Sequence, residues 1–154
     1  MRVKFLAAVM AVIFFSMSSA NAESPRDALD NFGFFGRWAV DCEHPASPTN
    51  NVRTARVSPT GDPVFDESLG GDGEPNLYVV LRTKRIDDDT MVLRTKLNGD
   101  IEQDLIMRRD GDRIRTMSNR DVQTRKYVVR DGVVASTKQP TPWLTRCAEP
   151  PKDS

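Results

Sequence analysis

The chain contains few residues that can ligate a metal ion or act as a nucleophile, with one histidine and two cysteines among 154 residues. Zinc sites are normally built from several cysteine and histidine ligands, and these sets cannot be assembled if the two cysteines bond to each other. The Cys-x-x-Cys spacing of thiol oxidoreductases and the Gly-x-Ser-x-Gly turn of serine hydrolases are also missing. We therefore expect no metal site, no cofactor and no enzymatic activity. We interpret His44, in a proline-containing segment, as solvated.

The acidic side chains do not define a site either. The 22 Asp and Glu residues offer many carboxylate pairs, but no pair is distinguished by its position. Asp87–Asp89 and Asp72–Glu74 contain oxygen ligands suited to calcium, yet neither segment matches an EF-hand loop. We interpret both segments as solvated turns.

Neither sign of charge is in excess, because 22 Lys and Arg residues balance the 22 Asp and Glu residues. A basic excess is typical of proteins that bind nucleic acids or anionic membranes. We therefore expect no nucleic-acid partner and no general attraction to membrane surfaces.

A long apolar run occurs only near the start of the sequence, where two basic residues precede Phe5–Phe15. The run is shorter than the ~20 residues that a membrane-spanning helix needs. The segment that follows it ends in Ala20-Asn21-Ala22, which has the pattern of a cleavage site. These features predict a Sec-type signal peptide over residues 1–22 and a periplasmic or secreted protein, with no integral membrane segment in the mature chain. The alternative is an N-terminal membrane anchor.

Both cysteines lie in the part of the chain that is predicted to be exported. In an oxidising compartment two cysteines most simply form a disulfide, here Cys42–Cys147. Trp38 and Trp143 each stand four residues before one of these cysteines. Two free thiols, or a catalytic thiol pair, are the alternative.

Alternation of apolar and polar residues dominates the chain after residue 36 and predicts short strands. Asn98-Gly99, Asp110-Gly111 and Asp131-Gly132 are typical hairpin turns between them. The fold class is therefore all-β, an antiparallel up-and-down meander of about eight strands, arranged as a barrel or a sandwich. We favour a closed barrel, because closure leaves no exposed sheet edge. The clearest expected strands are 77–84, 90–97, 101–108, 113–119 and 125–130.

Residues 37–147 are predicted to form one β-barrel domain. The preceding segment, 23–36, is expected to be a short helix, because Ser24 is a suitable N-cap and Pro25 suits the first helical position. Residues 148–154 are expected to form a disordered tail.

Pairing of the first and last strands would bring the two cysteines together. In that arrangement Asp41 and Arg146 are expected to form a charge pair on the face opposite the sulfur atoms. Trp38 and Trp143 are expected on the buried face, where large aromatic side chains usually pack. The alternative role of these tryptophans is to stack on a ligand.

Gly36-Arg37-Trp38 resembles the Gly-x-Trp motif at the first strand of the lipocalin and wider calycin group. Arg146, near the end of the chain, is similar to the arginine that packs across the tryptophan in that group. The resemblance covers the ends of the barrel and its topology, and it implies a closed barrel. A second likeness is to small exported barrel inhibitors of bacterial metalloproteases, which share a signal peptide, an N-terminal trunk and Gly-x-Trp. Their disulfide closes a short local loop, unlike a Cys42–Cys147 bridge.

Arginine is unevenly distributed, with seven Arg and one Lys against five acidic residues between Ile101 and Arg130. If some of these side chains point into a barrel mouth, they form an anion site, because a guanidinium binds carboxylate or phosphate in a bidentate way. The alternative is an outward, solvated strand face on which Arg alternates with Asp and Glu. The candidate ligand-binding residues are two tryptophans and five arginines: Trp38, Arg82, Arg94, Arg113, Arg115, Trp143 and Arg146.

These observations lead to the hypothesis of an exported, non-enzymatic binding protein for a small amphipathic or anionic, lipid-like ligand. Aromatic side chains would wall the ligand, and arginines would hold its head group. The alternative is a protein-interaction module of the cell envelope, such as a protease inhibitor or an assembly factor, which would use the N-terminal segment and the 68–76 loop. A ligand-binding protein needs a hollow barrel, whereas an inhibitor needs a filled barrel and a protruding segment.

Overall fold

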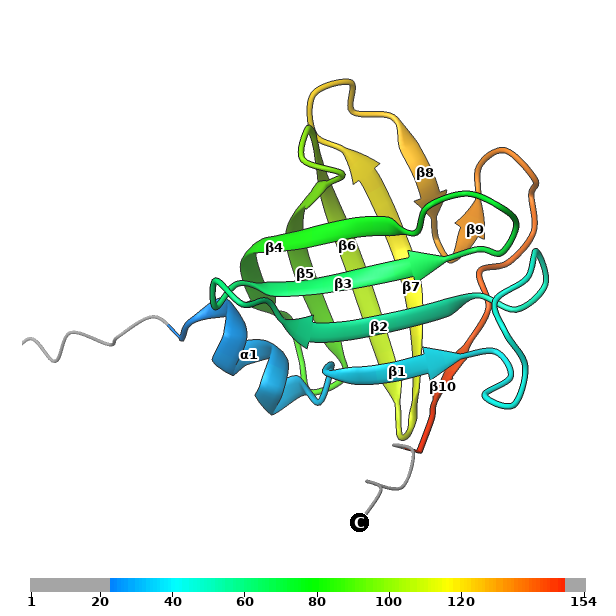
Figure 1. The fold of residues 1–154 in the computed structure, drawn as a ribbon. Coiled ribbons are helices and arrows are strands. Elements are labelled where there is room, and N and C mark those ends of the chain that lie inside the picture. Colours follow the sequence, from blue (N-terminus) through cyan, green and yellow to red (C-terminus); the bar gives the residue numbers. More distant parts are fainter. Residues whose placement is uncertain (1–22, 149–154) are drawn as a thin grey trace, which may run out of the picture.

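The computed structural model describes residues 23–148 of the chain (Figure 1). The predicted signal peptide, and the predicted tail beyond Ala148, lie outside this range. In the described part, no helix is long and apolar enough to cross a membrane.

In the part of the chain that the structure describes, one helix, α1 (Pro25–Phe32), precedes ten antiparallel strands, most of which pair with their neighbours in sequence. The strands are β1 (Gly36–Ala39), β2 (Val52–Val57), β3 (Pro63–Ser68), β4 (Asn76–Arg85), β5 (Thr90–Leu97), β6 (Ile101–Asp110), β7 (Arg113–Asp121), β8 (Tyr127–Arg130), β9 (Val133–Val134) and β10 (Leu144–Arg146).

The sheet closes on itself through β10, which pairs with β1 on one side and with β7 on the other. β1–β7 and β10 therefore form an eight-stranded closed barrel (Figure 1). β8 and β9 extend the sheet beyond this ring, because β10 pairs with the beginning of β7 and β8 pairs with its end. The predicted all-β antiparallel fold is confirmed, and the closed barrel rather than the sandwich is the arrangement.

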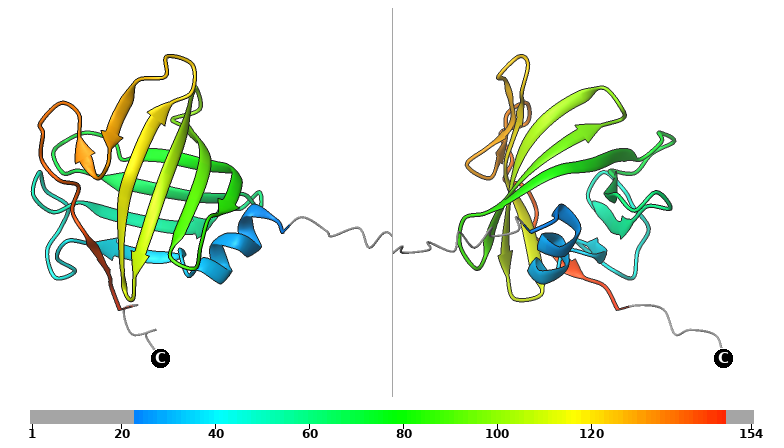
Figure 2. Two further views of the ribbon diagram at one scale, coloured as in Figure 1. Left: turned by 180° about the vertical axis from the view of Figure 1, so that it is seen from behind. Right: turned by 90° about the vertical axis from the view of Figure 1, so that its left-hand side faces the viewer.

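The predicted N-terminal helix is confirmed and lies at one end of β1–β4 (Figures 1 and 2). The Ser24 side chain accepts a hydrogen bond from the backbone N–H of Asp27, and Pro25 stands in the first turn. Gly33 ends the helix with φ of 71°, a conformation that costs glycine little because it has no Cβ. Leu29 and Phe32 are buried, so the apolar face of α1 completes the core at this end.

Side chains from alternate positions of the strands fill the inside of the barrel. Phe65 of β3 is at the centre of an aromatic group, with Phe34 edge-on at 5.5 Å and Tyr78 stacked at 4.4 Å between ring centroids. Contacts of this kind add to the hydrophobic effect of burying the rings. Other fully buried members of the core are Trp38, Met91, Leu93, Leu105, Met107 and Ile114.

Two of the predicted hairpin turns contain pairs of residues with positive φ. Asn98 and Gly99 have φ of 47° and 87°, and Asp131 and Gly132 have φ of 53° and 73°. Two successive positive φ values match the twist of the flanking strands, which explains why these dipeptides join β5 to β6 and β8 to β9.

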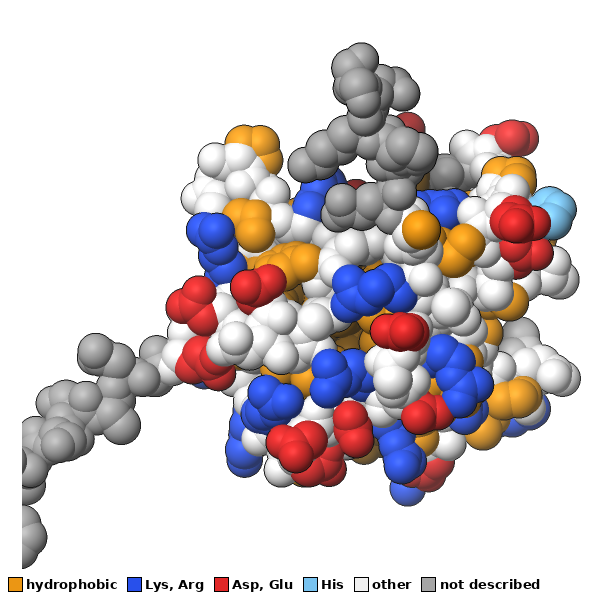
Figure 3. Space-filling view, turned by 90° about the horizontal axis from the view of Figure 1, so that it is seen from below, with side chains coloured by type: hydrophobic (Ala, Val, Ile, Leu, Met, Phe, Trp, Pro, Cys, Tyr) orange, Lys and Arg blue, Asp and Glu red, His pale blue; other side chains and the backbone are white. Residues whose placement is uncertain are grey.

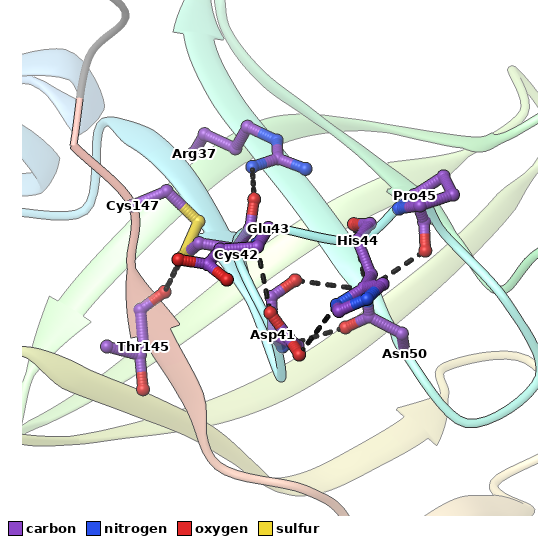
Figure 4. Close-up of a disulfide and its surroundings, with 9 residues drawn as sticks. All are labelled: Arg37, Asp41, Cys42, Glu43, His44, Pro45, Asn50, Thr145 and Cys147. Carbon is purple, nitrogen blue, oxygen red and sulfur yellow. Dashed lines mark hydrogen bonds and ion pairs between the residues drawn. A yellow bond between two sulfur atoms is a disulfide. The ribbon is translucent and has the colours of Figure 1, made fainter.

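The predicted disulfide Cys42–Cys147 is present, with 5.5 Å between the Cα atoms (Figure 4). Hydrogen bonds hold the two chain segments beside it. The Cys147 backbone N–H donates to the Arg37 carbonyl at 2.8 Å, and Arg37 Nη1 donates to the Cys42 carbonyl at 3.1 Å. The bridge therefore joins the chain just after β1 to the chain just after β10, where the barrel closes.

The predicted charge pair between Asp41 and Arg146 is wrong. The strand register places Arg146 opposite Trp38, and the guanidinium lies 4.3 Å from the centroid of the indole. Arg146 also donates hydrogen bonds to the carbonyls of Gly33 and Phe35. Asp41 instead lies 2.8 Å from His44 Nδ1 and accepts a hydrogen bond from the backbone N–H of Glu43.

The prediction that both tryptophans are buried is correct for Trp38 and wrong for Trp143. Trp38 has no exposed surface, whereas Trp143 is half-buried. The reason is strand alternation, because Leu144 is the residue that points into the core, opposite Ile114 of β7. Trp143 stands one position away, just before β10 begins.

Replacing both cysteines, Cys42→Ser with Cys147→Ser, is expected to lower the free energy of unfolding by about 4–5 kcal/mol, as the chain-entropy model assigns to such a loop. The reason is that the bridge restricts an unfolded chain over a separation of 105 residues. Urea denaturation of the oxidised wild type and the double variant measures this difference. A loss below about 1 kcal/mol would show that strand pairing alone holds the closure.

Candidate functional site

A cavity of about 220 Å³ lies inside the barrel. It is lined by the start of β2, the end of β3 and the start of β4, together with parts of β7–β10. Helix α1 lies toward the other end of β4, because Arg85 at the end of that strand stands over the Phe32 ring. The barrel is thus filled beside α1 and hollow at the opposite end.

An ion pair between a buried arginine and a half-buried glutamate lies at the floor of this cavity. Arg53 of β2 is 2% exposed and faces Glu67 of β3 across the strands, with 2.7 Å between Nη2 and Oε1. Arg53 Nη2 also donates to Thr116 Oγ1 at 3.2 Å, and the guanidinium lies 5.1 Å from the centroid of the Phe65 ring. Because an isolated buried charge is very unfavourable, Glu67 is the partner that allows Arg53 to stay inside.

Tyr78 of β4 stands beside this ion pair and also lines the cavity. Burial, in the first place, and the negative charge of Glu67, in the second, raise the pKa of Tyr78, while the charge of Arg53 opposes them. The hydroxyl therefore stays protonated at neutral pH, so that it is able to donate as well as accept a hydrogen bond.

Within the described residues 23–148, two buried polar atoms of the cavity lining have no hydrogen-bond partner, namely Oδ1 of Asn119 and Nε of Arg53. Asn119 is 7% exposed. Buried polar groups are nearly always paired in folded proteins, so such atoms mark a place where a partner is missing.

Much of the rim of the cavity is apolar, although the half-buried Asn51 and Asn76 also line the cavity. Leu69 and Val128 line the cavity and are each 48% exposed, and Val134 and Pro142 lie half-buried beside them. The site therefore combines a polar floor with an apolar entrance.

The predicted arginines of the sheet do not line this cavity. Arg82 and Arg94 are cross-strand neighbours whose side chains point outward, and Arg94 binds both carboxylate oxygens of Asp104, at 2.6 and 3.1 Å. Basic and acidic side chains are also interspersed on the underside of the molecule (Figure 3). Arg82 and Arg94 therefore follow the alternative stated from the sequence, in which arginines lie among acidic residues on an outward, solvated strand face.

Arg113 and Arg115 flank the indole of Trp143 on the outside of the barrel. Arg113 pairs with Asp110, and Arg115 donates to the Gly132 carbonyl at 2.8 Å. The remaining two predicted site residues, Trp38 and Arg146, lie at the α1 end. The predicted set is therefore dispersed over three places and forms no single site.

Arg53, Glu67, Tyr78 and Asn119 were not singled out from the sequence. The available signal is strand alternation, which places Arg53 on the same face of β2 as Ala55. Arg56 stands on the opposite face of the same strand, so each face carries an arginine. The pattern alone therefore does not tell which face is inside.

A second depression, on the outer face of β5–β7, offers less chemistry. Its charged residues are already engaged, since Asp104 binds Arg94 and lies 3.6 Å from Arg120, whose guanidinium stands over Tyr127. Within residues 23–148, no three His, Cys, Asp or Glu side chains come together as metal ligands.

Comparisons with protein-family models, with curated proteins and with solved structures give no match. Over residues 23–148, the class of protein that the structure defines is therefore a small, disulfide-linked, eight-stranded antiparallel barrel with one helix and an internal cavity.

The variant Glu67→Leu is expected to lose about 3–5 kcal/mol of unfolding free energy, because it leaves the Arg53 charge buried without a partner. The double variant Arg53→Met with Glu67→Leu is expected to be more stable than Glu67→Leu. Urea denaturation measures both.

The matched control is Asp66→Leu, which removes a partner of Arg56 from an exposed ion pair on the same two strands. Its expected cost is at most about 1 kcal/mol. Equal losses for Asp66→Leu and Glu67→Leu would contradict a special role of burial.

In alkaline solution the wild type is expected to lose stability more steeply than Tyr78→Phe. An unfolded tyrosine releases its proton near pH ~10, whereas the raised pKa of Tyr78 keeps the proton on in the folded state. The stabilisation is therefore complete below about pH 10 and falls as the pH rises above it. Urea unfolding in steps from about pH 8 to about pH 11 tests this, and parallel curves for the two proteins would refute it.

Proposed function

We propose that this protein is an exported, non-enzymatic binding protein that holds a small amphipathic ligand in the barrel cavity. The observation that carries the proposal is the cavity itself, with the Arg53–Glu67 pair at its floor and apolar side chains at its rim. Ligand sites are typically apolar hollows with a few polar groups that fix orientation.

The size of the cavity limits the ligand. Pockets for drug-sized molecules have volumes of ~300–1,000 Å³, and this cavity has about 220 Å³. Only the polar end of a ligand and a short apolar part therefore fit inside. The exposed Leu69 and Val128 are placed to contact an apolar remainder at the entrance.

Two features support export and a lipocalin-like role. The disulfide is typical of oxidising compartments, which agrees with the predicted signal peptide over residues 1–22. Arg146 lies across Trp38, the residue pair on which the resemblance to the lipocalin group was based.

The hollow barrel favours ligand binding over the alternative of an inhibitor or assembly factor. The N-terminal segment 23–36 packs onto the barrel rather than projecting from it: Phe32 is buried, and its carbonyl accepts a hydrogen bond from Arg109 Nη1 at 3.0 Å. A segment held in this way does not supply a free inhibitory trunk.

Native mass spectrometry of the protein purified from the compartment to which it is exported tests the proposal. A small non-covalent adduct is expected, released by organic solvent. The variant Val134→Trp, which places a large side chain at the rim of the cavity, is expected to lose most of the adduct.

The matched control is Val92→Trp, which enlarges a half-buried side chain in the depression outside the barrel. This variant is expected to keep the adduct. An adduct that survives Val134→Trp and disappears in Val92→Trp would place the ligand on the outer face and refute the cavity as the binding site.

A further inference from the structure

We propose that the ligand of the cavity has an uncharged polar head group, such as an alcohol or a carboxamide, attached to an apolar chain. This inference rests on the proposed function and goes further, because it excludes the anionic ligands that the arginine content of the sequence suggested. The observation behind it is that the charges at the cavity floor already balance.

A charged head group would meet one favourable and one unfavourable charge at the floor. Arg53 Nη2 and Glu67 Oε1 are only 2.7 Å apart, so any ion that approaches one of them also approaches the other. The head group would also lose its hydration, and a buried charge without its own counter-charge is strongly disfavoured. A carboxylate and an ammonium group are therefore both expected to bind poorly.

Asn119 supplies what a neutral head group needs. Its side chain lines the cavity, is 7% exposed, and has an Oδ1 atom without a partner. A carboxamide carries a donor on one side and an acceptor on the other, and a half-turn of the group exchanges them. Because Oδ1 itself is buried, the carboxamide of Asn119 has to turn toward the cavity to pair with a ligand hydroxyl or amide, as an acceptor or as a donor.

Tyr78 provides a second neutral partner from the opposite side of the barrel. It lines the same cavity on β4, whereas Asn119 stands on β7. Its hydroxyl keeps its proton, so it offers both a donor and an acceptor without adding charge. A hydroxyl or carboxamide between the two is therefore able to pair with both partners without bringing a charge into the cavity.

The volume sets the size of a suitable probe. At ~30 Å³ for each molecule of liquid water, a cavity of about 220 Å³ corresponds to roughly seven waters. A head group with a short alkyl chain fits this space, and the apolar rim at Leu69 and Val128 accepts the rest of the chain.

The test uses the wild-type protein and four compounds that share a chain of equal length: 1-octanol, octanamide, octanoate and octylammonium. Isothermal titration calorimetry at neutral pH compares their dissociation constants. Octanol and octanamide are expected to bind at least about ten-fold more tightly than either ion. Val134→Trp is expected to weaken all binding, which places the compounds in the cavity.

Two variants test the assigned roles. Asn119→Leu is expected to weaken octanol and octanamide several-fold. Glu67→Gln leaves the charge of Arg53 unbalanced, so it is expected to shift the preference toward octanoate. Circular dichroism verifies that each variant is folded, and the wild-type series decides the question even if a variant does not fold.

The outcomes separate the inference from the proposed function. If octanoate or octylammonium binds as tightly as octanol, and Val134→Trp blocks that binding, the inference of a neutral head group is refuted. The cavity then remains a ligand site. If none of the four compounds binds, or if Val134→Trp has no effect on binding, the cavity is not the site and the proposed function fails with the inference.

Discussion

Strand β10 closes the barrel, and both the aromatic core and the cavity require that closure. This strand contains only Leu144–Arg146, yet it is the element that joins β1 to β7. So few backbone hydrogen bonds form a weak seam, and two further interactions hold it: the Cys42–Cys147 bridge just beyond the strand and the stacking of Arg146 on Trp38. Without closure there is no inside face, and neither the aromatic core nor the cavity has a wall on that side.

Arginine performs two different tasks at the two ends of the barrel. At the α1 end, Arg109 and Arg146 donate to the carbonyls of residues 32, 33 and 35, groups at or beyond the end of the helix that lack partners within it. At the open end, Arg53 is paired with Glu67 deep in the barrel. The first arrangement fixes a plug of apolar side chains, and the second leaves a polar floor. The guanidiniums of Arg109 and Arg146 thus pair with backbone carbonyls at the surface, whereas the buried guanidinium of Arg53 pairs with a carboxylate.

The local features of the fold were predictable because they depend on neighbouring residues. Asn98-Gly99 and Asp131-Gly132 tolerate positive φ, and Ser24 with Pro25 marks the start of a helix. The errors came from features that depend on distant residues. Strand alternation indicates which side chains share a face, but the pairing of β10 with β1 and β7 decides which face is inside, and it places Leu144 there rather than Trp143.

The all-β class, the hairpin turns and the pairing of the two cysteines follow from the order of the residues, since alternation and turn dipeptides are local and two cysteines allow a single pair. Which charged residues are internal depends on how the strands pair in space. Arg53 and Arg94 both stand in alternating strands, yet Arg53 lies 2% exposed beside the half-buried carboxylate of Glu67, while Arg94 pairs with Asp104 on the outer face. The physical reason is that an arginine is stable inside when the neighbouring strand places a counter-charge opposite it. The contact between Arg53 and Glu67 depends on the register of β2 and β3, and this register cannot be read from composition or from the local alternation of residues.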